Sequence, residues 1–103
     1  MFDLLLSAAI TTSQAPIIAQ AQAATVYLPI STTQSSRQNC VTYKATNATS
    51  RAVKDVNVNR RNSAGKIYKY SLSSFLAYGT LGSGESVNFD LCDNSFVNVE
   101  AKQ

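Results

Sequence analysis

The fold is decided by residues 53–72, which read VKDVNVNRRNSAGKIYKYSL and hold two alternating runs around a turn. In the first run Val56 and Val58 fall on one face of an extended chain, and the asparagines that follow them fall on the other. Side chains of a strand alternate between its faces, so this period of two indicates a β-strand buried on one side. The turn ends in Gly65, which accommodates the positive φ of a tight hairpin. Residues 53–72 therefore predict a β-hairpin.

The same alternation continues on both sides of this hairpin. We expect further strands, separated by turns rich in Gly, Asn, Asp and Ser, at residues 26–30, 40–46, 87–91 and 97–101. Residues 73–78 leave room for one helical turn or a crossover, and no stretch carries a sustained helical period. Pro29 cannot donate to a ladder, so the first strand is expected at a sheet edge. Short strands at this spacing are typical of a single antiparallel β-sandwich.

Charge divides the chain into two parts. The first 36 residues hold one charged side chain, Asp3, whereas all nine Lys and Arg lie from Arg37 onward. We therefore predict an apolar N-terminal arm, residues 1–24, followed by a β-sandwich domain, residues 25–103. Exposed apolar chain is a liability, so we expect the arm to be buried against its own domain or a neighbouring subunit. Its large aliphatic side chains are Leu4, Leu5, Leu6, Ile10, Ile17 and Ile18.

The arm has a second interpretation, a secretory leader. Leu4 to Ile10 supplies an apolar stretch, and the sequence AQA at residues 21–23 supplies a small-residue cleavage site. The pattern is incomplete, because a leader begins with positive charge and Pro16 interrupts the apolar run. A bilayer span needs about 20 mostly apolar residues, so no transmembrane segment is predicted.

Two cysteines, Cys40 and Cys92, are too few for a structural zinc site and too far apart for a redox pair. They predict one disulfide or two buried thiols. A bond between cysteines 52 residues apart stabilises by about 4 kcal/mol in the chain-entropy account and implies an oxidising or extracellular compartment. Cys92 shares the alternation of Asn88 and Asp90 and not that of the core positions. A bond is therefore expected at the rim of the sandwich.

Residues for catalysis are scarce. The chain has no histidine, and no Gly-x-Ser-x-Gly motif accompanies its serines. We therefore expect no enzymatic activity, no cofactor and no metal site. Asp90, Asp93 and Glu100 offer oxygen ligands for calcium, but they lack EF-hand spacing, and an Asx-type turn explains these residues better, without a metal. The sequence Asn47-Ala48-Thr49 matches a glycosylation pattern, which we interpret as a turn.

One segment of the chain is strongly basic. Six of the nine cationic residues fall between residues 51 and 69, opposed there only by Asp55. With nearby tyrosines, expected to fill the core and its edges, they offer a candidate surface for nucleic acid. A solvated hairpin whose lysines prevent edge pairing explains them better, so nucleic acid is not the expected partner. The six are Arg51, Lys54, Arg60, Arg61, Lys66 and Lys69, and the tyrosines are Tyr43, Tyr68 and Tyr70.

Two short motifs resemble bacterial and phage immunoglobulin-like surface modules. The run ATNAT at residues 45–49, followed by VKDVNV at residues 53–58, resembles the x-N-x-turn-V-x-V hairpin of those modules. The run LGSGESV at residues 81–87 is similar to their L-x-P-G-E-S-V turn, although Ser83 replaces the proline and makes this turn less rigid. The resemblance covers about residues 40–91. It implies an immunoglobulin-like antiparallel β-sandwich of about seven strands.

Such modules serve as adhesin stalks, filament subunits, periplasmic chaperone-like proteins and phage virion decorations. We therefore expect a structural or assembly protein of a virion or extracellular filament, whose partners are copies of itself or a larger scaffold. The alternative is an exported periplasmic or secreted binding or chaperone-like module with a cleaved leader. That leader, with Leu4 to Leu6 and Ala8-Ala9, is similar to the opening of curli accessory proteins. A basic nucleic-acid-binding domain is the third hypothesis.

Overall fold

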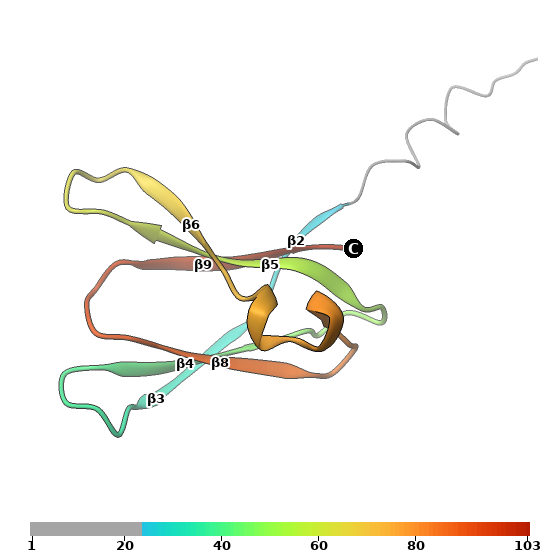
Figure 1. The fold of residues 1–103 in the computed structure, drawn as a ribbon, viewed down its shortest axis with the longest axis horizontal. Coiled ribbons are helices and arrows are strands. Elements are labelled where there is room, and N and C mark those ends of the chain that lie inside the picture. Colours follow the sequence, from blue (N-terminus) through green and yellow to red (C-terminus); the bar gives the residue numbers. More distant parts are fainter. Residues whose placement is uncertain (1–23) are drawn as a thin grey trace, which may run out of the picture.

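Residues 24–103 are described by a computed structural model, and they form two antiparallel β-sheets (Figure 1). The larger sheet has five strands in the order β2-β9-β5-β6, with β7 also paired to β5, and the smaller has the order β3-β4-β8. The prediction of an all-β fold is confirmed. The strands are β2 (Thr25–Tyr27), β3 (Ile30–Gln34), β4 (Val41–Thr46), β5 (Val53–Arg61), β6 (Ile67–Ser71), β7 (Thr80–Leu81), β8 (Ser86–Leu91) and β9 (Phe96–Lys102); two 3-10 turns, η2 (Ser73–Phe75) and η3 (Ala77–Gly79), follow β6.

The core combines inward-facing side chains of both sheets. Its buried members are Leu28, Ala45, Val53, Val56, Val58, Leu72, Leu81, Val87, Phe89, Leu91, Val99 and Ala101. Tyr43 of the smaller sheet stacks on Phe96 of the larger one, with ring centroids 4.5 Å apart, and on Phe89 at 5.3 Å. Because stacked rings contribute beyond their buried area, this trio ties the two sheets together.

The first predicted strand is wrong in its extent. The chain does not run straight from Val26 to Ile30, because β2 pairs with β9 in the larger sheet whereas β3 pairs with β4 in the smaller. Pro29 interrupts the ladder between them and restricts the residue before it. Leu28, which precedes the proline, is buried in the core. This split and the short β7 give eight strands over residues 24–103, against about seven predicted.

Two irregularities reset the alternation of side chains. In β5, Val53 and Val56 are both buried although they are three residues apart, because the register with β9 shifts at Asp55, whose φ is 51°. Such a β-bulge leaves one residue unpaired and turns the strand. A second register shift follows Asn59, and Phe96, one residue before the strand expected at residues 97–101, packs against the core.

Tyr68 and Tyr70 do not fill the core as predicted. Both lie on β6, an edge strand of the larger sheet, and every residue of β6 is exposed. The smaller sheet has three strands, too few to cover the full width of the larger one. In Figure 1 the hairpin formed by β5 and β6 extends away from the smaller sheet. The turn of this hairpin contains Gly65, whose φ of 84° is positive, as expected from the sequence.

Candidate functional site

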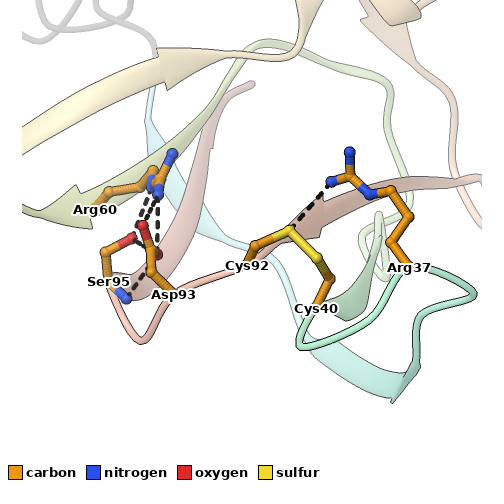
Figure 2. Close-up of polar contacts among 6 residues, drawn as sticks. All are labelled: Arg37, Cys40, Arg60, Cys92, Asp93 and Ser95. Carbon is orange, nitrogen blue, oxygen red and sulfur yellow. Dashed lines mark hydrogen bonds and ion pairs between the residues drawn. A yellow bond between two sulfur atoms is a disulfide. The ribbon is translucent and has the colours of Figure 1, made fainter.

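A disulfide joins Cys40 and Cys92 (Figure 2). The register of β4 and β8 places Val41 opposite Leu91, so the two cysteines form the next pair at the ends of these strands. The bond therefore links neighbours within the smaller sheet and does not cross the core, which agrees with the alternation of Cys92. Cys40 is buried and Cys92 is exposed.

Arg37, in the loop between β3 and β4, contacts this bond. Its Nη2 donates to Cys92 Sγ at 3.3 Å, and its Nε lies 3.7 Å from Asp90 Oδ2 (Figure 2 shows the sulfur contact). Asp90 also accepts hydrogen bonds from Thr42 Oγ1 at 2.5 Å and Ser35 Oγ at 3.1 Å. The pKa of Asp90 is lowered, and the hydrogen bond from Thr42 is the largest cause. Desolvation opposes this effect, whereas the hydrogen bond from Ser35 and the charge of Arg37 add to it. The loop is thereby held over the end of β8.

Asp93 closes the turn between β8 and β9. Its Oδ1 accepts a hydrogen bond from the backbone N–H of Ser95 at 3.1 Å, which makes an Asx turn. Arg60 Nη2 donates to both carboxylate oxygens, at 3.0 and 2.8 Å (Figure 2). The side-chain hydrogen bond from Ser95, with smaller help from Arg60, lowers the pKa of Asp93.

Glu100 belongs to a polar ladder on the outer face of the larger sheet. Asn59 Nδ2 donates to Glu100 Oε1 at 2.9 Å and to Asn98 Oδ1 at 2.7 Å. Lys69 of β6 pairs with Glu100 Oε2. The hydrogen bonds from Lys69 and then Asn59 lower the pKa of this buried carboxyl. Asp90, Asp93 and Glu100 thus engage separate partners, and residues 24–103 contain no group of three or more His, Cys, Asp or Glu able to hold a metal ion.

The lowered pKa values of these carboxyls predict acid sensitivity. Their contribution to stability is complete above the ordinary carboxyl range, about pH 4 to 4.5, and is lost as the pH falls through the lower values of the folded state. We expect the urea midpoint to be level from pH 7 to about pH 5 and to fall below about pH 4. Urea unfolding curves across this range measure it.

Glu100→Gln is expected to reduce the fall of the urea midpoint below about pH 4, and to lower the free energy of unfolding by about 1 kcal/mol at neutral pH. Lys69→Gln removes the largest cause of the lowered pKa of Glu100 and leaves the carboxyl in place. It should reduce the same fall of the urea midpoint. If the urea midpoint of both variants falls with pH as it does in the natural protein, the ionisation of Glu100 does not contribute to the stability of the fold.

The six basic residues of segment 51–69 lie in separate places along the hairpin and do not form one surface. Two lie at the start of β5, and the others lie near its far end or on β6. Because β5 has nine residues, its two ends are roughly 30 Å apart. Arg60 and Lys69 are held in the ion pairs described above, and Arg61 Nη1 donates to the carbonyl of Gly65 at 3.0 Å. The group at the start of β5 is Arg51 and Lys54; the remaining four are Arg60, Arg61, Lys66 and Lys69.

Asn47 of the glycosylation pattern has no exposed surface. Its Nδ2, the atom that would carry a glycan, donates to the carbonyls of Arg51 at 2.8 Å and Leu81 at 3.0 Å. Its Oδ1 accepts from the N–H of Thr49 at 3.0 Å and from the Thr49 hydroxyl at 2.6 Å. The pattern is therefore a turn in the folded domain. The side chain also joins that turn to β7, which the sequence alone did not indicate.

Large apolar side chains are exposed on both faces of β6 and on the 3-10 turns after it. We call the following five residues the aromatic flank: Ile67, Tyr68, Tyr70, Phe75 and Tyr78. Tyr70 and Phe75 line a groove of about 460 Å³ with Phe89 and Asp90 of β8 and Arg37. Sequence reasoning missed this surface, because the alternation of β6 places its tyrosines on the same side as the core.

The six aliphatic residues of the predicted arm lie outside the described residues. Within residues 24–103 no helix has both the length and the apolar character that crossing a membrane requires. Comparisons with protein-family models, with curated proteins and with solved structures found no match. The case for a function therefore rests on the sequence and the geometry of the domain.

Proposed function

We propose that this protein is a non-enzymatic assembly module, a subunit or decoration of a larger particle such as a phage virion or extracellular filament. Its partners are copies of itself or a larger protein scaffold. The observation that carries the proposal is the aromatic flank, in which Tyr70 and Phe75 line one groove, because exposed apolar surface of this kind marks a contact with another molecule. Tyrosine and phenylalanine are enriched at the centres of such contacts. The apolar arm offers a second adhesive element on the same chain.

The strand connections support an immunoglobulin-like form of the sandwich. The chain crosses from the smaller to the larger sheet between β4 and β5 and again between β8 and β9. Strands β4 and β8 are neighbours in one sheet, and β5 and β9 are neighbours in the other. Paired crossings of this kind are characteristic of the immunoglobulin fold.

The disulfide supports a location outside a reducing cytoplasm. Bonds of this kind persist on virions, in the extracellular space and in the periplasm, where thiols are not kept reduced. The proposed setting is therefore a virion or an extracellular assembly, with the periplasm as the alternative.

Sedimentation of the full chain across concentration tests the proposal. We expect species larger than the 11.1 kDa monomer to appear below about 0.1 mM, the range of a weak but specific contact. The double substitution Leu4→Asp with Leu6→Asp places two charges in the apolar arm and is expected to leave a monomer. Gln14→Asp adds the same type of charge at a polar position of the arm and should assemble like the natural chain.

Two results would contradict the assembly proposal. One is a natural chain that stays monomeric over this range. The other is a mass spectrum of the protein from its natural source that begins at Ala24, which would favour the exported module with a cleaved leader.

A further inference from the structure

We propose that the free edge of β6 receives residues 4–10 of a neighbouring copy, which add to the larger sheet as a further strand. This inference rests on the proposed assembly function and names the surface and the segment through which copies join. The incoming segment reads LLLSAAI.

The edge of β6 is open to pairing. Its five residues pair with β5 on one side, from Ile67 opposite Arg61 to Ser71 opposite Asn57. On the other side no strand of the described domain follows. Natural edge strands are commonly protected by proline or by lysine, which discourage pairing with another chain. β6 contains no proline, and its one lysine, Lys69, is paired with Glu100 on the outer face of the sheet.

The groove at this strand has aromatic side chains in its lining beside polar ones, Ser36, Arg37, Asn88 and Asp90. The aromatic members are Tyr70, Phe75 and Phe89, the last from β8 of the smaller sheet. When a peptide adds to a sheet edge, main-chain hydrogen bonds supply affinity and pockets for alternate side chains supply specificity. An added strand with Leu4 and Leu6 on one face would bring both toward such a groove.

Tyr78 is a second observation that indicates a partner on this side. Its φ of 55° lies in the left-handed region, which costs an ordinary residue about 1 kcal/mol. The residue is fully exposed. A tyrosine held in this conformation with its ring in water gains little within its own domain. Strained, exposed aromatic residues of this type are suited to contacts with another molecule.

Residues 4–10 are the most suitable strand within residues 1–23. They contain no charge and no proline, whereas Ile17 and Ile18 follow Pro16, which cannot donate to a ladder. The linker of residues 11–23 spans up to about 45 Å when extended. The segment can therefore reach another molecule.

The chain enters the described domain at the edge of the larger sheet that is opposite to β6. Ala24, from which the arm departs, accepts a hydrogen bond from the N–H of Gln103 at 3.0 Å, beside β2. β2 and β6 are opposite edges of the larger sheet. A donor at one edge and a receiver at the other permit a head-to-tail contact that repeats from copy to copy.

Mixing two defective variants tests the inference. The receiver variant carries Ile67→Lys and Tyr70→Lys on β6, and the donor variant carries Leu4→Asp and Leu6→Asp. We expect each alone to require at least a tenfold higher concentration for assembly. An equimolar mixture should form a complex of twice the 11.1 kDa chain mass and stop there. Tyr27→Lys, at an exposed aromatic position on the opposite edge strand, is the matched control and should assemble like the natural chain.

Hydrogen exchange on the natural chain provides a readout that needs no substitution. We expect amides of residues 67–71 to exchange at least tenfold more slowly in the assembled protein than in the monomer, with residues 25–27 changed less. Equal rates in β6 would overturn the inference even if the β6 variants failed to fold.

The outcomes separate this inference from the proposed function. A receiver variant that folds and assembles normally would overturn the β6 contact and leave assembly itself intact. A mixture that stays monomeric, when each variant alone is defective, would place the arm on its own domain and overturn the exchange between copies. A natural chain that never assembles would overturn both proposals.

Discussion

Replacing both Cys40 and Cys92 with serine is expected to lower the free energy of unfolding by about 4 kcal/mol. The bond joins residues 52 apart in sequence, so its loss releases a long loop in the unfolded chain. Within residues 24–103, β8 is an edge strand that pairs only with β4, and the disulfide closes the end of that pair. Small domains have net stabilities of about 5–15 kcal/mol, so a loss of this size is a large part of the total.

Urea unfolding of the double variant at neutral pH measures this loss. Natural protein with reductant is the matched comparison and should show the same decrease, because both lack the bond. A difference below about 1 kcal/mol would contradict the prediction and would indicate that the reduced, unfolded chain remains compact.

The second large effect is expected at Asn47, where alanine should cost about 3 kcal/mol. The substitution removes the donors to the carbonyls of Arg51 and Leu81, the second of which is buried, and the acceptor of Thr49. A buried polar group left without a partner costs its full desolvation. The backbone of Asn47 still bonds Glu85 and Gly84, at 2.8 and 2.7 Å, so the turn keeps part of its anchoring.

Two further substitutions separate the roles of the Asn47 side chain. Thr49→Val removes one hydroxyl and is expected to cost about 1 kcal/mol. Asn47→Asp keeps the acceptor for Thr49 but loses both donors, and should destabilise at least as much as alanine, since a buried carboxylate would then face two carbonyls. Thermal and urea unfolding of the three variants test this order. An alanine variant as stable as the natural protein would contradict a structural role for this side chain.

Local alternation was sufficient for much of the fold. The hairpin of residues 53–72, the all-β class and the buried positions Val56 and Val58 follow from the period of two alone. The outward position of Cys92 follows from the same rule. These features depend on neighbours along one strand, and their information lies within a few residues.

The candidate surfaces depended on information that local pattern does not contain. The alternation of β6 places Tyr68 and Tyr70 on the core side, but only the strand order shows that β6 is an edge and that the smaller sheet is too narrow to cover it. The bulge at Asp55 and the sheet change at Pro29 likewise arise from pairing with distant strands.

For this protein the sequence by itself determined most of the strand segments, which face of most strands is apolar, and that the first 36 residues carry a single charge, Asp3. Only the tertiary structure decided which strands are edges, which carboxylates have partners, and that an aromatic flank remains in solvent. The physical reason is that side-chain alternation is a local property of an extended chain. Edge position and burial depend on contacts between residues far apart in sequence.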